Sequence, residues 1–170
     1  MVNGLILVAG KGTRMRELTK FPKCLTSING KPLIELIIQN FKKSGINNIT
    51  LVTGFKHELL KKYGKQVIFN KKWKNTNMLY SLLCARDLLK FDTIVSYGDI
   101  LYNSEIIKEL KSSKCNLTFA YDPNWKKLWS KRFENPLDDA ETFRINSKGY
   151  IKDIGSKTND YSKIQGQYMG

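Results

Sequence analysis

The chain has 170 residues, of which 41% are hydrophobic and 26% are charged, so it is long enough for one domain with a hydrophobic core. Its apolar runs fall far short of a membrane span, and its N-terminus lacks the basic region and the cleavage-type segment of a signal peptide. The cysteines Cys24, Cys84 and Cys115 and the single histidine, His57, favour neither a disulfide framework nor a zinc site. We therefore expect a cytoplasmic protein with free thiols and no membrane partner.

The formal net charge of +14 raises the hypothesis of a basic RNA-binding protein. The lysines are spread along the chain, however, in pairs such as Lys42-Lys43 and Lys61-Lys62, which is typical of a solvated surface. Such a charge favours attraction of small polyanions. We expect no nucleic-acid partner, and a homo-oligomer is compatible with the sequence.

Strands and helices alternate over the first two-thirds of the chain. An apolar run from Asn3 to Ala9 predicts a buried first strand, and Pro32 opens a helix that Gly45 ends. The pattern then predicts strands at 48–53, 66–69 and 93–97 and helices at 56–63, 76–90 and 104–110. In the 76–90 helix, five residues are expected to face the core: Met78, Leu79, Leu82, Leu83 and Leu89. This alternation predicts a parallel, doubly wound sheet that binds ligands at the carboxyl ends of its strands.

The remaining third of the chain has a different rhythm. We expect Ser104 to cap the N-terminus of the 104–110 helix, followed by a strand at 116–121 and a loop-like aromatic and charged insert at 123–140. Strands at 142–145 and 150–154 flank a hairpin signal, Asn146-Ser147-Lys148-Gly149. The chain stops at Gly170 in what looks like the beginning of a buried strand, so we expect a single domain, 1–170, truncated at its C-terminus.

A glycine-rich loop follows the first strand, in Val8-Ala9-Gly10-Lys11-Gly12-Thr13-Arg14, and Pro22-Lys23 comes soon after. Glycine lets backbone N–H groups approach phosphate oxygens. The loop is not a dinucleotide fingerprint, because Met15 stands where a third glycine is needed, and Gly30-Lys31-Pro32 is not a P-loop. The glycines alone are also compatible with a plain turn. An arginine and a lysine that converge on a triphosphate, Arg14 and Lys23, suit phosphoryl-type transfer, in which positioning and charge neutralisation do most of the catalysis.

The stretch from Leu5 to Leu25, followed by Gly30-Lys31-Pro32-Leu33, resembles the signature of the sugar-phosphate and cholinephosphate nucleotidylyltransferases. The resemblance implies an α/β, Rossmann-like fold of glycosyltransferase-A type, with a three-layer, mostly parallel sheet and a small β-hairpin insert near the C-terminus. It also implies that the glycine loop wraps a triphosphate, while Arg14 and Lys23 contact phosphates. The nucleotide-binding candidates in and around this loop are Ala9, Gly10, Lys11, Gly12, Thr13, Arg14 and Lys23.

Asp99 follows Gly98, a further nucleotide-binding candidate, at the end of a buried strand and matches the metal-binding aspartate of that family. The resemblance therefore implies Mg²⁺ as the cofactor, held by one carboxylate and by triphosphate oxygens. The alternative is an aspartate that serves only as a turn residue. A second acidic ligand is expected from beyond the segment that ends the chain, which leaves the activity of this chain alone open.

The segment Asn75-Thr76-Asn77-Met78, leading into Ser81-Leu82, looks like the cytidylyltransferases for phosphocholine and phosphonates. Asn77 and Ser81 are candidates to hydrogen-bond a pyrimidine, Asn75 is a candidate helix cap, and Gly54 closes the second strand beside the same pocket. The insert resembles segments of cytidylyltransferases from phosphonate or amino-acid phosphate pathways. Its acceptor-binding candidates are Tyr121, Trp125, Trp129, Lys131, Arg132 and Glu141. In the structural alternative, the tryptophans anchor the insert to a core and the charges are solvated.

The sequence thus predicts a nucleotidylyltransferase that transfers a cytidylyl group from CTP, or another nucleoside triphosphate, to a small phosphate or phosphonate acceptor and releases pyrophosphate. Its expected catalytic residues are Arg14, Lys23 and Asp99. Lys23 and the magnesium on Asp99 stabilise the developing charge, and Arg14 holds the leaving pyrophosphate. Two alternatives stay open: a sugar-1-phosphate nucleotidylyltransferase that uses UTP or dTTP, and a non-catalytic nucleotide-binding protein.

Overall fold

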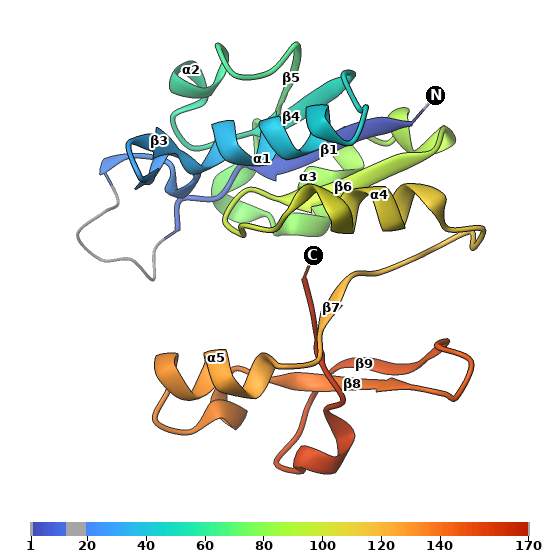
Figure 1. Ribbon diagram of the computed structural model, residues 1–170. Helices are drawn as coiled ribbons and strands as arrows, with labels where there is room; N and C mark the ends of the chain where they lie inside the picture. Colours follow the sequence, from blue (N-terminus) through green and yellow to red (C-terminus); the bar gives the residue numbers. More distant parts are fainter. Residues whose placement is uncertain (1, 13–19, 170) are drawn as a thin grey trace. The chain divides into compact units, whose positions relative to one another are not determined.

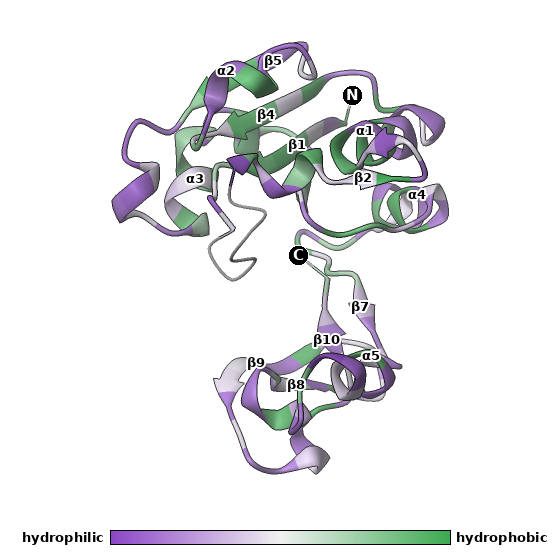
Figure 2. Ribbon diagram, turned by 90° about the vertical axis from the view of Figure 1, so that its left-hand side faces the viewer, coloured by the Kyte–Doolittle hydropathy of each residue, from purple (hydrophilic) through white to green (hydrophobic). Residues whose placement is uncertain are grey.

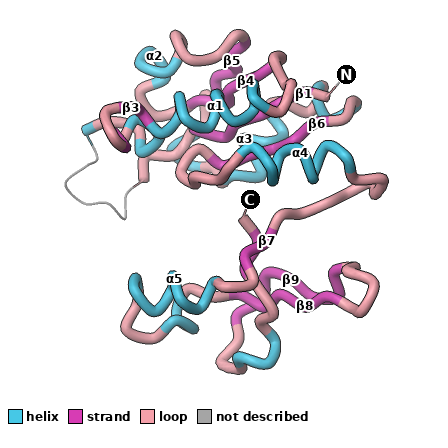
Figure 3. Tube along the Cα trace, in the orientation of Figure 1, coloured by secondary structure: helices cyan, strands magenta, loops and turns pink. Residues whose placement is uncertain are grey.

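The computed structural model describes residues 2–12 and 20–169, which form two compact units, Met1–Cys115 and Asn116–Gly170 (Figure 1). The first unit contains a parallel sheet with its helices, and the second contains antiparallel strand pairs and one α-helix (Figure 3). In the described part of the chain, no helix has both the length and the apolar character that crossing a membrane requires. The single domain predicted over 1–170 stays a prediction.

A four-stranded parallel sheet organises the first unit. Its strands are β1 (Asn3–Val8), β4 (Ile49–Thr53), β5 (Gln66–Phe69) and β6 (Thr93–Tyr97). Their order across the sheet is β5-β4-β1-β6, so that β1 pairs with β4 on one side and with β6 on the other. The chain therefore builds outward from β1 in one direction and then returns to the other side. This reversal is the topological switch point beside which doubly wound sheets bind ligands.

Helices cover both faces of this sheet. On one face, α1 (Leu33–Lys43) and α4 (Ser104–Ser112) share a core with Ile6 and Val8 of β1. On the other face, Leu5 and Leu7 of β1 pack with residues from and just after α3 (Met78–Cys84). Because successive side chains of a strand point to opposite faces, both sets of side chains in β1 must be apolar where helices cover the sheet, and residues Leu5–Val8 are. Figure 2 shows β1 in the colour of hydrophobic residues over most of its length. These three layers confirm the predicted fold class.

Smaller elements connect the layers of the first unit. An antiparallel pair, β2 (Ser27–Ile28) and β3 (Lys31–Pro32), precedes α1. The short helix α2 (His57–Leu60) follows β4. Turns of 3-10 helix occur at Lys23–Leu25, Trp73–Asn75 and Leu88–Lys90. Helix α1 ends as predicted before Gly45, whose φ of +77° favours glycine.

Three details of the first unit differ from the sequence predictions. The helix predicted at 76–90 ends at Cys84, and a 3-10 turn follows it. Its expected core residues are mostly exposed, because the small residues Ser81 and Ala85 form the buried side instead: Met78, Leu79, Leu83 and Leu89 are the exposed ones. Helix α3 is apolar on nearly every side, so its periodicity did not identify the buried face. The cap of α4 is Asn103, which accepts a hydrogen bond from the backbone N–H of Ile106, rather than Ser104.

The second unit is built from short antiparallel pairs. β8 (Glu141–Ile145) pairs with β9 (Ile151–Lys157), which confirms the predicted hairpin. β7 (Tyr121–Asp122) pairs with β10 (Gln167–Tyr168), so a strand does form near the end of the chain. Between these pairs, α5 (Trp125–Arg132) and turns of 3-10 helix at Pro136–Asp138 and Tyr161–Lys163 complete the unit.

Two predictions for the second unit were wrong. The strand expected at 116–121 is reduced to Tyr121–Asp122, and the preceding residues Leu117 and Phe119 are exposed. The insert expected to be a loop contains α5, because Trp125 and Trp129, one helical turn apart, pack with Ala140 and Ile164 in a small core. The charged residues between the tryptophans concealed this helical spacing.

Candidate functional site

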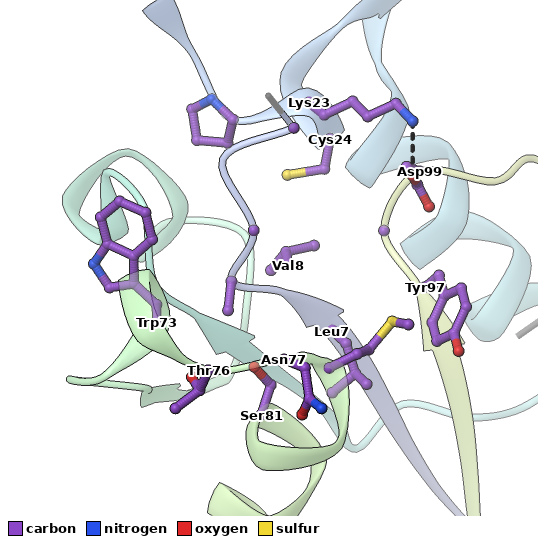
Figure 4. Close-up of a pocket in the computed structure, with 16 residues that line it drawn as sticks. Leu7, Val8, Lys23, Cys24, Trp73, Thr76, Asn77, Ser81, Tyr97 and Asp99 are labelled. Atoms are coloured by element: carbon purple, nitrogen blue, oxygen red, sulfur yellow. Dashed lines mark hydrogen bonds and ion pairs between the residues drawn. The ribbon is translucent and has the colours of Figure 1, made fainter. Parts of the chain in front are cut away.

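A pocket of about 210 Å³ lies at the switch point of the parallel sheet, where β1 and β6 end (Figure 4). Its walls come from four segments of the first unit that are distant in the sequence. Those lining it are Leu7–Gly10 with Gly12, Pro22–Cys24, Trp73 with Thr76–Met78 and Ser81, and Tyr97–Asp99. The doubly wound topology thus gathers residues from both halves of the sheet around one cavity.

Two glycines allow the strand ends to approach each other closely at this pocket. A Cβ on Gly98 would collide with the side chain of Val8 in the neighbouring strand. A Cβ on Gly54 would lie 2.6 Å from the Ala9 carbonyl oxygen and 2.5 Å from Trp73 Cβ. The backbone at Gly54 therefore packs directly against Ala9, which lines the pocket, and the backbone N–H of Phe55 donates to the Ala9 carbonyl at 3.0 Å.

The glycine loop reaches the pocket through Gly10 and Gly12. Gly12 has a φ of +70°, in the left-handed region that favours glycine, and Lys23 lies against it. A Cβ at Gly12 would lie 3.3 Å from Lys23 Cβ, so a larger residue would crowd this contact. The small loop residues therefore leave room for a bulky anionic group beside the Lys23 side chain.

Lys23 and Asp99 form an ion pair on one side of the pocket, with 2.7 Å between Nζ and Oδ2 (Figure 4). Lys23 begins the 3-10 turn after the glycine loop, and Asp99 follows β6, so the fold brings together residues 76 positions apart. Their side chains are 38% and 41% exposed. Solvent screens such a pair and limits its contribution to stability, so its charges are available to a ligand.

Cys24 follows Lys23 and lines the same pocket. Burial, together with a smaller contribution from the negative charge of Asp99, raises the pKa of its thiol to about 12. The thiolate is the nucleophilic form of cysteine, so this side chain stays neutral and unreactive at physiological pH. Cys24 therefore acts as an apolar wall and gives no covalent chemistry to the pocket.

The start of α3 forms the wall across from Lys23 and Asp99, where Thr76, Asn77 and Ser81 lie near one another (Figure 4). Asn77 caps the helix, because its side-chain oxygen accepts from the backbone N–H of Tyr80 at 3.2 Å. Asn75, the other cap candidate, belongs to the preceding 3-10 turn instead. One side of the pocket thus carries charge, and the other carries hydroxyl and amide groups.

The structure brings most of the predicted nucleotide-binding residues to this one pocket. They are Ala9, Gly10, Gly12, Lys23, Asn77, Ser81 and Gly98, and the predicted metal ligand Asp99 lines the same pocket. Lys11 is not among the lining residues, and its ammonium lies 5.8 Å from the centre of the Phe55 ring. Thr13 and Arg14 lie outside the described residues, so their predicted contacts with phosphate stay predictions.

The predicted acceptor-binding residues all lie in the second unit, which is described by itself. Trp125 is buried, and its indole N–H donates to the carbonyl oxygen of Ile164 at 3.4 Å, which favours the alternative of a core anchor. The Arg132 guanidinium lies 5.3 Å from the centre of the Trp129 ring, and Lys131 beside it is exposed.

Two further acceptor candidates belong to strands of this unit. Tyr121 stacks on Phe143, with 4.9 Å between the ring centres. Glu141 begins β8, and its backbone N–H and carbonyl bond the side-chain amide of Gln167. The assignment of these residues to an acceptor stays a prediction.

The sequence analysis missed several residues of the site. Trp73 and Tyr97 form apolar walls of the pocket, and Asn70 is buried behind it with its amide bonded to Ser81. Asn70 directly follows β5, and a polar residue at the carboxyl end of a predicted parallel strand was the signal available for finding it.

The metal-binding capacity of the site rests on Asp99. The described residues contain no group of three or more His, Cys, Asp or Glu side chains that could hold an ion by themselves. Mg²⁺ is commonly bound through one or two carboxylates together with substrate phosphates and water. A single carboxylate, Asp99, on the wall of the pocket therefore fits a cation that binds together with a triphosphate.

Comparison with known proteins identifies the family. Residues 4–125 match the model of the MobA-like NTP transferase domain. The chain is 40% identical to the CTP:phosphoglutamine cytidylyltransferase of Campylobacter jejuni, and the match covers 99% of this chain and 71% of that protein. It is 35% identical to the choline-phosphate cytidylyltransferase of Streptococcus pneumoniae, over 66% of this chain and 51% of that one.

A solved structure extends the comparison to three dimensions. The CTP:phosphocholine cytidylyltransferase of Streptococcus pneumoniae matches with a TM-score of 0.62 and 25% identity, covering 99% of this chain and 65% of that one. The present chain thus spans about half to seven-tenths of the length of these relatives. The predicted resemblance to the nucleotidylyltransferases, and in particular to the cytidylyltransferases, is confirmed. The chain belongs to the MobA-like NTP transferase family of nucleotidyltransferases.

Proposed function

We propose that this protein transfers a cytidylyl group from CTP to a small phosphate or phosphonate acceptor, with release of pyrophosphate. The observation that carries the proposal is a single pocket that joins the glycine loop, Lys23, Asp99 and the start of α3 at the switch point of the sheet. The relatives named above are cytidylyltransferases, which favours CTP over other nucleoside triphosphates. Their named acceptors, phosphoglutamine and choline phosphate, favour a small phosphorylated molecule.

In this proposal the residues of the pocket position and neutralise the triphosphate. The backbone N–H groups of the glycine loop and the Lys23 ammonium hold phosphate oxygens. An acceptor oxygen forms a bond to the α-phosphorus while the bond to the pyrophosphate oxygen breaks in line with it, so no covalent enzyme intermediate forms. Arg14, outside the described residues, is proposed to hold the leaving pyrophosphate.

The Lys23–Asp99 ion pair represents the site before a nucleotide binds. Without a nucleotide, the ammonium and the carboxylate neutralise each other at 2.7 Å. Phosphate oxygens compete for Lys23, which frees the Asp99 carboxylate to hold a cation. Nucleotidyltransferases of this family generally use a divalent metal. We propose Mg²⁺, which would supply neutralisation of the phosphate charge when bound.

We propose in addition that the second unit supplies the acceptor contacts within a single domain over 1–170. Its basic residues Lys131 and Arg132 have the charge to hold a phosphate or phosphonate. The Trp129 ring lies beside the Arg132 guanidinium, and Tyr121 is 37% exposed, so aromatic faces are also present for a cationic headgroup.

Calorimetric titration with CTP, UTP, dTTP, GTP and ATP, with and without magnesium, tests the nucleotide assignment. We expect CTP to bind most tightly and its affinity to rise when magnesium is present, because Asp99 would hold the cation and the cation would neutralise phosphate charge. A preference for UTP or dTTP would instead support a sugar-1-phosphate nucleotidylyltransferase. A pyrophosphate-release assay with phosphocholine, 2-aminoethylphosphonate or a phosphorylated amide as acceptor then separates an enzyme from a non-catalytic nucleotide-binding protein.

A further inference from the structure

Asn70 is a buried hydrogen-bonding centre directly behind the pocket. Only 1% of its surface is exposed. Its backbone N–H donates to the Thr53 carbonyl at 2.8 Å, and its carbonyl accepts from the backbone N–H of Trp73 at 3.2 Å. Its side-chain amide reaches Lys72, Thr76 and Ser81. Asn70 thus joins the end of β5 to the 3-10 turn and to α3, and it has no surface with which to contact a ligand.

The surrounding groups determine which way the Asn70 amide faces. The backbone N–H of Lys72 is a donor only, and the Asn70 atom that accepts from it at 2.9 Å must be the oxygen. The amide nitrogen therefore faces the two hydroxyls, Thr76 Oγ1 and Ser81 Oγ, each at 3.1 Å. Thr76 agrees with this assignment, because its proton goes to the Lys72 carbonyl at 2.9 Å and its oxygen is left to accept.

This arrangement leaves Ser81 with one unused proton. Its oxygen accepts from the Asn70 amide, so its O–H is directed elsewhere. Within residues 2–12 and 20–169, no group accepts that proton. Ser81 is 5% exposed and lines the pocket across from the Lys23–Asp99 pair (Figure 4). A buried donor without a partner is unfavourable, and a hydrogen-bond acceptor on a bound ligand would satisfy it.

We propose that Asn70 is a positioning residue for nucleotide selection: it holds the Ser81 hydroxyl as a donor toward the pocket, and this donor discriminates cytosine from uracil. The inference rests on the proposed function. On its Watson–Crick edge, cytosine carries acceptors at N3 and O2, whereas uracil carries an N–H donor at N3. A hydroxyl that is fixed as a donor bonds the N3 of cytosine and opposes the N3–H of uracil. The discrimination comes from the direction of one proton, and Asn70 sets that direction without touching the base.

The test is to reverse the direction in which the Ser81 O–H bond points. In Asn70→Asp the side chain keeps its size and, when it is ionised, has only acceptors, so the Ser81 proton turns toward it and a lone pair faces the pocket. We expect the ratio of CTP to UTP affinity, measured by calorimetric titration with magnesium, to fall about tenfold, the equivalent of one hydrogen bond. Asn70→Ala introduces no buried charge and frees the hydroxyl to rotate, so the ratio should fall about threefold.

The matched control is Asn3→Asp. Asn3 is also buried and accepts a side-chain hydrogen bond, from Asn48 Nδ2 at 2.6 Å, but it begins β1 at the end of the strand away from the pocket. It should keep the wild-type ratio, and thermal melting of each variant establishes that it is folded. A general loss of packing would weaken CTP and UTP binding equally and leave their ratio unchanged.

The outcomes separate the inference from the proposed function. A wild-type preference for CTP that persists in both folded Asn70 variants would overturn the inference and leave the cytidylyltransferase proposal intact. Equal wild-type affinity for CTP and UTP would overturn both. A ratio that falls in the Asn70 variants and not in Asn3→Asp would support the positioning role.

Discussion

At the scale of single residues, the pocket combines an exposed ion pair with a neutral thiol. Lys23 and Asp99 are accessible enough to exchange partners, whereas burial keeps Cys24 protonated between them and the strand ends. The site therefore acts on a ligand through electrostatic interactions, and the charged groups that it offers are the Lys23 ammonium and the Asp99 carboxylate. A pair of this kind contributes little to folding, about 0–1 kcal/mol, so its residues are available for a functional role.

Replacing Lys23 tests this division between function and stability. We expect Lys23→Ala to lower the turnover of CTP by about 10²–10³-fold, because it removes a cation from the developing charge. The melting temperature should change little, since the pair is solvent-screened. Lys61→Ala is the matched control, because Lys61 forms a comparable exposed ion pair with Glu58, at 2.8 Å, and does not line the pocket. Unchanged turnover in a folded Lys23→Ala protein would remove Lys23 from the mechanism.

At the scale of elements, α3 carries out a structural and a functional task with the same residue. Ser81 and Ala85 lie one turn apart and are small, so their side of the helix packs closely against the sheet while larger apolar residues such as Leu79 stay exposed. This close approach places the Ser81 hydroxyl beside the Asn70 amide at 3.1 Å. A bulkier residue at position 81 would therefore disturb both the packing of α3 and the wall of the pocket.

The cap of α4 provides a prediction about element stability. The Asn103 side chain accepts from the backbone N–H of Ile106, and Ser104 is the first residue of the helix. We expect Asn103→Ala to lower the free energy of unfolding by about 1 kcal/mol, because a backbone donor loses its partner. Ser104→Ala should change it by less than about 0.5 kcal/mol. Urea unfolding followed by circular dichroism measures both, and a larger effect from Ser104→Ala would restore Ser104 as the cap.

At the scale of the whole molecule, the net charge of +14 has no single location. Lysines occur in both units, and several lie over aromatic rings, as Lys56 does over Phe21 at 5.3 Å and Lys126 over Tyr161 at 4.2 Å. By contrast, Lys23 lines the pocket itself. The dispersed charge raises the local concentration of any polyanion, whereas the pocket selects one of suitable size and shape.

Salt dependence distinguishes these two effects. We expect binding of a single-stranded RNA oligonucleotide to be weak and to fall steeply between about 50 and 200 mM salt, because it rests on counterion release alone. Magnesium–CTP should keep most of its affinity over this range, since hydrogen bonds and base contacts also hold it. Fluorescence anisotropy of labelled RNA and calorimetry with CTP measure the two slopes. RNA affinity that exceeds that of CTP and is not displaced by it would revive the RNA-binding alternative.

Local patterns predicted the parts of this fold that depend on neighbouring residues. A few adjacent residues were enough to predict three features: the buried strand β1, the hairpin at Asn146–Gly149 and the end of α1 before Gly45. Helix α5 was missed because charged residues lie between its two tryptophans in the sequence. Helix α3 was assigned the wrong buried face because apolar residues occur on nearly all of its sides. In both cases the partner that decides the structure lies elsewhere in the chain.

The sequence by itself determined the alternation of strands and helices, the glycine loop after β1 and Lys23 as a candidate, because each rests on residue type and local spacing. It also identified Asp99 as a candidate, through the resemblance to the nucleotidylyltransferases. Only the tertiary structure decided that Lys23 reaches Asp99 across 76 positions, and that Asn70 holds Ser81. Contacts of this kind depend on strand order and helix packing. The direction of a hydroxyl proton depends further on which donors and acceptors surround it, and these come together only once the chain has folded.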